Sequence, residues 1–80
     1  MPTNTLRAAR EAALMSQTSL ARQSGLSAHT IVNLERGYTR ATMDTRERIL
    51  TVLGISKRRH LEIFGPLPTL GRPGKGELTG

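Results

Sequence analysis

The chain has 80 residues with 12 basic and 6 acidic side chains, a formal net charge of +6, and no cysteine. This length fits one small domain, and the lack of cysteine excludes disulfide bonds and thiolate metal sites. The charge favours a polyanionic partner, either nucleic acid or an acidic membrane surface, although a solvated basic surface would also account for it. No apolar run is long enough to span a bilayer or to serve in a signal peptide, so we expect a cytoplasmic protein.

Five short helices are predicted along the chain, and no segment resembles a strand. Apolar residues make up 36% of the chain, with one Tyr, one Phe and no Trp, which favours packed helices over a sheet. Each helix has a capping side chain at its start and apolar residues at helical spacing within it, and each of the last four has a glycine at its end. The expected helices cover residues 5–14, 16–24, 27–36, 44–53 and 56–64, with Asp44 or Thr42 as the cap of the fourth.

The second and third helices are separated by a very short connection. Only Gly25, Leu26 and Ser27 lie between them. We expect Gly25 to end the second helix in the left-handed conformation and Ser27 to cap the third. Such a short link forces two short helices to cross sharply.

The composition changes after residue 65. Three of the four prolines and four of the eight glycines lie in residues 66–80. The sequence therefore predicts a folded domain over residues 1–65 and a flexible tail over residues 66–80. Ten basic and five acidic residues belong to the domain, so the positive charge is not that of a basic tail.

Two opposite charges occupy positions meant for the core. Arg10 lies in the apolar stripe of the first helix, and Glu35 lies beside Ile31 and Leu34 in that of the third. A buried carboxylate is costly unless it is paired, and a guanidinium can bind it through two hydrogen bonds. We therefore expect a buried ion pair between Arg10 and Glu35. The alternative is that both lie at stripe edges and reach water.

Residues 16–37, SQTSLARQSGLSAHTIVNLERG, combine several features at fixed spacing. These are Gln17 at the start of a helix, a small Ala21 at the crossing, Gly25 at the turn, the apolar Leu20, Ile31 and Leu34, and a closing Glu35-x-Gly37. The pattern closely resembles the helix-turn-helix of the phage-repressor and Cro-like (Xre-type) DNA-binding family. That family commonly pairs the glutamate with an arginine on its first helix, and Arg10 stands at the matching place.

The resemblance extends over residues 6–64, because the family also continues into a fourth helix that ends in a pattern seen here as residues 53–56, LGIS. One departure is the loop before that helix, where many members have a proline and this chain has residues 40–43, RATM. The resemblance implies an all-α, five-helix, lambda-repressor-like DNA-binding domain that needs no cofactor.

The resemblance implies that the third helix enters the major groove of double-stranded DNA. With Ile31 facing the core, the opposite face carries His29, Val32, Asn33 and Arg36. The expected base-reading residues are Ala28, His29, Val32 and Asn33; without the motif, His29 would be read as a solvated surface imidazole. The expected phosphate contacts are Ser16, Gln17, Thr18, Arg36, Tyr38, Thr39 and Arg40. Thr42 and Arg46 are weaker candidates, and the basic run Lys57, Arg58 and Arg59 is more simply a solvated face.

We expect a dimer on DNA, because one short helix reads too few base pairs for a genomic site. Two-fold symmetry then predicts a palindrome with half-sites about one helical turn apart. Ile63 and Phe64 are candidate dimer contacts, although core packing is favoured for Phe64 and Leu61.

The simplest function is that of a small Cro-like repressor, whose origin in a phage or mobile element would fit its size. An enzyme is not expected, since no two carboxylates share a face and His29 and His60 lie on different helices. Two alternatives remain open. One is an antitoxin-type module that also binds a protein partner, and the other is a non-specific architectural binder of nucleic acid.

Overall fold

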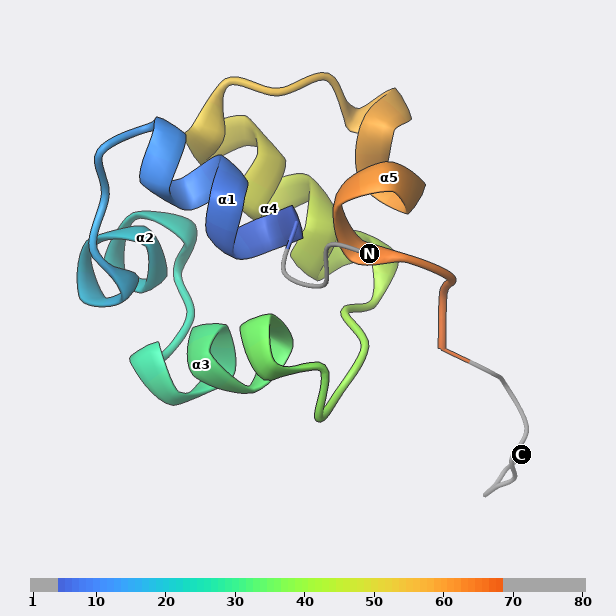
Figure 1. Cartoon of the computed structure of the whole chain (residues 1–80), viewed down its shortest axis with the longest axis horizontal. Coiled ribbons are helices and arrows are strands. Elements are labelled where there is room, and N and C mark those ends of the chain that lie inside the picture. The colour runs from blue at the N-terminus through green and yellow to red at the C-terminus, as the bar shows by residue number, and fades with distance from the viewer. Residues whose placement is uncertain (1–4, 69–80) are drawn as a thin grey trace.

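The computed structural model describes residues 5–68, which form five α-helices and one short 3₁₀ turn (Figure 1). No strand occurs in this part of the chain, and the predicted all-α fold is confirmed. Most of the expected flexible tail lies outside the described residues. The elements are α1 (Thr5–Ala12), α2 (Gln17–Ser24), α3 (Ala28–Arg36), α4 (Met43–Leu53), the 3₁₀ turn η1 (Lys57–Arg59) and α5 (His60–Phe64).

The three central helices share the same start and stop signals. At each start a hydroxyl side chain accepts a hydrogen bond from the backbone N–H three residues on, and at each end a glycine takes a φ between 72° and 78°. Glycine adopts this left-handed conformation without the strain that a Cβ would add. The caps are Ser16, Ser27 and Thr42, and the glycines are Gly25, Gly37 and Gly54.

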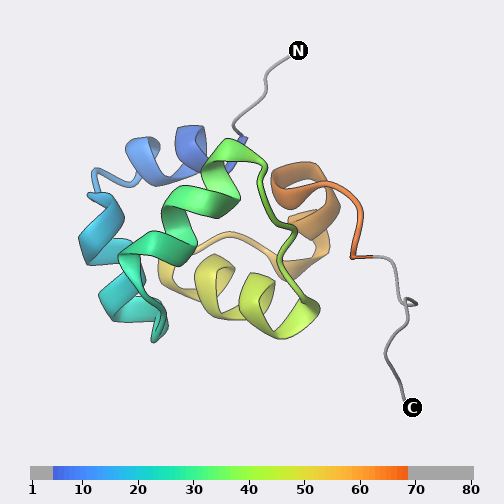
Figure 2. The same ribbon diagram turned by 90° about the horizontal axis from the view of Figure 1, so that it is seen from below.

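The core lies where the helices cross. It is formed by Leu6, Leu20, Ala21, Ile31, Ile49, Leu50 and Ile63, all at most 6% exposed. α2 packs on both α3 and α4, while α1 packs on α3 and α5. Seen from below, α3 lies across the near face, flanked by α2 on one side and by the loop after α3 on the other (Figure 2). In residues 5–68 no helix has the length and apolar character needed to cross a membrane.

The first helix is shorter than predicted. α1 ends at Ala12, and Leu14 is 93% exposed with a φ of 59°. The chain turns there to start α2, and Met15 packs on the core in place of Leu14. The prediction that the first helix continues to Leu14 and buries it is therefore wrong, because the turn interrupts the helical spacing.

Leu14 carries backbone strain that glycine would relieve. A left-handed conformation costs a non-glycine residue roughly 1–2 kcal/mol. We expect Leu14→Gly to raise the free energy of unfolding by about 0.5–1 kcal/mol in urea denaturation, despite the added freedom of the unfolded chain. The neighbouring Ala13, exposed and without a positive φ, provides the control. Ala13→Gly should lower stability by a similar amount, and a loss of stability in both variants would contradict the strain argument.

The last helix differs from prediction in the face that it buries. Ile63 is 6% exposed in the core, Leu61 is 56% exposed, and Phe64 is partly buried against the core. The expectation that Leu61 packs in the core is wrong. The segment after Ser56 begins with the 3₁₀ turn η1, which has about 3.0 residues per turn instead of 3.6 and so rotates the residues that follow. Ile63, a candidate dimer contact in the sequence analysis, instead packs in the core of its own domain.

Candidate nucleic-acid interface

The crossing of α2 and α3 depends on two small residues. Ala21 is 2% exposed, and its carbonyl accepts a hydrogen bond from the Leu26 N–H at 2.8 Å. Gly25 has a φ of 76°, and a Cβ added there would lie 3.1 Å from a guanidinium nitrogen of Arg48. The left-handed φ therefore favours glycine at this turn, which places α3 directly after α2.

α3 has one buried face and one exposed face. Ile31 is 0% and Glu35 6% exposed. On the other side His29 and Arg36 are exposed, and Asn33 is half-buried. Val32 is also half-buried, and Ala28 packs partly against the core. The four expected base-reading residues thus lie on one short helix, with His29 the most accessible of them.

The structure brings Arg10 and Glu35 together. Arg10 Nε donates to Glu35 Oε2 at 2.6 Å, and Arg10 Nη2 donates to Oε1 at 3.1 Å. Both side chains are almost completely buried. The hydrogen bonds that Arg10 donates to Glu35, together with the negative charge of Glu35, raise the pKa of Arg10 above its ordinary value, against the lowering effect of burial. A charged, two-bond pair therefore joins α1 to α3.

Two further contacts complete this junction. Gln17 Nε2 donates to Glu35 Oε1 at 3.0 Å, and Arg10 Nη1 donates to the Met15 carbonyl at 2.8 Å. Gln17 was expected to contact phosphate, but its amide is bonded to Glu35. The carboxylate is consequently held by α1 and α2 at once, which fixes the rotation of α3 about its own axis. In the sequence, the misplaced charges and the family resemblance both predicted the Arg10–Glu35 pair, but nothing predicted that Gln17 would bind Glu35.

The other expected phosphate contacts lie at two exposed places. Ser16 caps the start of α2, and Thr18 is exposed beside it. Arg36, Tyr38, Thr39 and Arg40 are exposed at the end of α3 and in the loop that follows. The Arg36 guanidinium lies 5.9 Å from the centre of the Tyr38 ring. The free backbone N–H groups at the start of a helix and nearby cations are both suited to phosphate.

Arg46, a weaker phosphate candidate, lies elsewhere. It is 0% exposed and donates hydrogen bonds to backbone carbonyls inside the domain. The phosphate assignment is therefore wrong for this residue. Its helical spacing with Ile49 and Leu50 was the signal for burial. Thr42, the other weaker candidate, caps α4.

The basic run Lys57–Arg59 is exposed and forms η1. Figure 1 shows this gold segment, between α4 and α5, on the side of the molecule opposite α3. Arg59 is paired with Glu62 at 2.7 Å, and that pairing lowers the pKa of Glu62. η1 therefore does not border the exposed face of α3.

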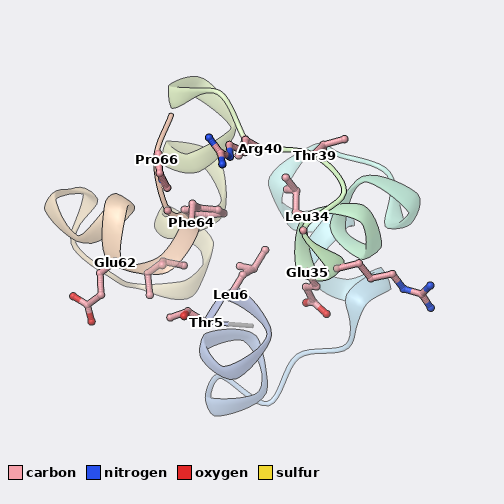
Figure 3. Close-up of a pocket in the computed structure, with 14 residues that line it drawn as sticks. Thr5, Leu6, Leu34, Glu35, Thr39, Arg40, Glu62, Phe64 and Pro66 are labelled. Atoms are coloured by element: carbon pink, nitrogen blue, oxygen red, sulfur yellow. The ribbon is translucent and has the colours of Figure 1, made fainter. Parts of the chain in front are cut away.

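A groove of about 420 Å³ opens beside the loop after α3 (Figure 3). Thr39 and Arg40 lie along its upper part, Phe64 and Pro66 on the α5 side, and Leu6 at the start of α1. Within residues 5–68 no three His, Cys, Asp or Glu side chains lie close enough together to hold a metal ion.

The fold and the exposed, rigidly anchored third helix define a helix-turn-helix DNA-binding protein. A family model described as Helix-turn-helix matches residues 6–59, which is most of the chain. The chain belongs to the Xre/Cro-like helix-turn-helix family, and the resemblance seen in the sequence is confirmed. No curated protein matches the chain.

Proposed function

We propose that this DNA-binding helix-turn-helix regulator is a small, cytoplasmic, Cro-like repressor that recognises a palindromic operator as a homodimer. The observation that carries the proposal is the division of α3 into a buried face, fixed through Glu35, and an exposed face. A reading helix must meet base edges at a constant angle, and the Arg10–Glu35–Gln17 junction supplies that rigidity.

The exposed face of α3 has side chains suited to base edges. Asn33 pairs with adenine N6 and N7 through two hydrogen bonds, and Val32 or Ala28 contacts a thymine methyl. His29 donates to or accepts from a base edge. These contacts select the sequence, whereas phosphate contacts place the protein on the duplex.

Phosphate contacts in this proposal come from both sides of α3. The start of α2 offers its N–H groups with Ser16 and Thr18, and the following loop offers Tyr38, Thr39 and Arg40. Repression then occurs by occlusion of a promoter, without a cofactor. The dimer forms on DNA through the end of α5, where Phe64 retains some exposure; Ile63 is occupied by its own core.

Selection from a random duplex-DNA pool, with sequencing of the bound fraction, tests this function. The expected result is a palindrome with half-sites about one helical turn apart, or about 10 base pairs. The selection is run at low and at physiological salt. Recovery of no motif, with binding that disappears as salt rises, would instead indicate an architectural binder held by charge alone.

Arg40→Ala should weaken binding to all duplexes by a similar factor. Arg40 is exposed in the loop, so its expected partner is a phosphate, and its loss should reduce the slope of log K against log salt by about one. Arg58→Ala is the matched control, because it removes the same charge from η1, on the side opposite α3. Equal effects of the two substitutions on the salt slope would contradict a specific contact by the loop.

A further inference from the structure

Arg46 is the largest fully buried side chain in the described part of the chain, at 0% exposure. It forms no ion pair within residues 5–68. Its Nε donates to the Ala41 carbonyl at 2.9 Å, Nη1 to the Gly65 carbonyl at 2.6 Å, and Nη2 to the Pro66 carbonyl at 2.7 Å. Nη1 also lies 2.9 Å from His60 Nδ1, which must accept because a guanidinium only donates.

Burying an arginine in this way carries a free-energy cost that an apolar core residue would not have. An arginine without a carboxylate loses its hydration and gains only uncharged partners, among them the Phe64 ring at 5.4 Å, whereas an apolar side chain of similar volume avoids the penalty. Burial lowers the pKa of Arg46 from its ordinary value, and the positive charge of Arg40 lowers it further. The advantage of arginine here is therefore geometric, because its planar fork binds several carbonyls at fixed angles.

The carbonyls that Arg46 holds belong to two segments far apart in the chain. Ala41, 4% exposed, directly follows Arg40 in the loop after α3. Gly65 and Pro66 follow α5. Gly65 has φ 79° and ψ −166°, a conformation that essentially only glycine adopts, and it turns the chain so that consecutive carbonyls face the guanidinium. Figure 3 shows Arg40 beside Pro66, where the two segments meet at the groove.

We propose that Arg46 is a positioning residue for DNA binding: it fixes the loop after α3 against the Gly65–Pro66 segment and so presents Thr39 and Arg40 to phosphate. The inference rests on the proposed function, since it concerns how those loop contacts are made. Arg46 itself touches no DNA, because it is completely buried.

The first test compares Arg46→Met with Arg48→Met in the full chain. Both remove one positive charge from α4, but Arg48 is exposed and forms a surface ion pair with Asp44. Met fills the buried volume and donates no hydrogen bond. We expect Arg46→Met to weaken binding to the selected operator by about fivefold, the effect of misplacing one phosphate contact, while Arg48→Met changes it by less than about twofold. Equal affinities of the two variants would overturn the inference.

The second test asks whether Arg46 acts through Arg40. If it does, Arg46→Met should weaken binding by a smaller factor in the Arg40→Ala background than in the wild type, because Thr39 is then the only one of the two proposed loop contacts left to misplace. Losses that multiply would overturn the inference and leave the phosphate contact intact. An Arg40→Ala variant that binds like the wild type would instead overturn the loop's part in the proposed function, and this inference with it.

The third test needs no DNA. In the free protein, amide hydrogen exchange of residues 39–42 should accelerate in Arg46→Met, with α2 and α3 unchanged. Arg46→Lys serves if the Met variant does not fold, since it keeps the charge but loses the fork, and the same selective acceleration is expected. Exchange at the wild-type rate in the loop, or acceleration throughout the domain, would show that Arg46 only supports the core.

Discussion

Replacing Glu35 by alanine is expected to lower the free energy of unfolding by about 3–5 kcal/mol, because it leaves the Arg10 guanidinium buried and without a carboxylate. Arg10 and Glu35 expose only 10% and 4% of their side chains, so bulk water has little access to the guanidinium that loses its partner. Urea denaturation followed by circular dichroism measures the change. The loss is large for a small domain, and it should also abolish DNA binding at temperatures where the wild type is folded.

Glu11→Ala is the control for this experiment. Glu11 is paired with Arg7 at 3.1 Å on the surface of α1, with more than half of each side chain exposed. Its loss should change stability by no more than about 0.5 kcal/mol. A Glu35→Ala variant that melts within error of the wild type would remove the argument that the pair anchors α3.

A double substitution separates two effects: the destabilisation caused by a buried charge without a partner, and the contribution of the intact ion pair to DNA recognition. Arg10→Met with Glu35→Leu leaves no buried charge, so its stability should exceed that of either single variant. Its α3 is held only by apolar contacts, and the hydrogen bond from Gln17 is also lost. We therefore expect recovered stability with weaker discrimination between the operator and a scrambled duplex. Full recovery of both would show that the junction has no part in recognition.

Asn33→Ala is expected to cost about 1–3 kcal/mol of binding free energy at one base position and to relax the preference there. The side chain of Asn33 lies on the exposed side of α3, while its backbone carbonyl accepts the Tyr38 N–H at 3.0 Å. Alanine keeps that backbone bond, so the fold should be unaffected. Repeating the selection with the variant measures the change position by position.

The contrast with Arg40→Ala makes this prediction specific. Arg40 should affect all duplexes alike, because phosphates carry no sequence information directly. If Asn33→Ala and Arg40→Ala both weaken binding uniformly, α3 is not the reading helix. A shifted preference in Asn33→Ala alone would identify the base pair that Asn33 contacts.

Most of the fold could be predicted from the sequence because its signals are local. Hydroxyl caps and left-handed glycines fix the bounds of α2, α3 and α4, and helical spacing identifies their buried faces. The end of α1 was missed because a left-handed leucine has no sequence signature. The buried face of α5 was missed because residues 56–64 were counted at α-helical spacing throughout, whereas residues 57–59 form the 3₁₀ turn η1.

For the site, the sequence was informative where a charge broke an apolar pattern. The Arg10–Glu35 ion pair could be predicted because two opposite charges at apolar positions are expected to pair. Arg46 broke the pattern of α4 in the same way, yet it had no acidic counterpart to suggest a partner. Three of its acceptors are backbone carbonyls, which every residue has and no sequence pattern marks. A lone cation at an apolar position therefore indicates burial but not what it binds.

If α3 reads DNA as proposed, its two faces evolve under different constraints, one set by folding and the other by recognition. Ile31 and Glu35 are held by the core, so changes there threaten the fold, whereas His29 is exposed and its replacement should be nearly neutral for stability. Mutations on the exposed face can accumulate without loss of the folded protein. A duplicated copy of this chain could thus acquire a different operator in a few substitutions, with the buried junction inherited unchanged.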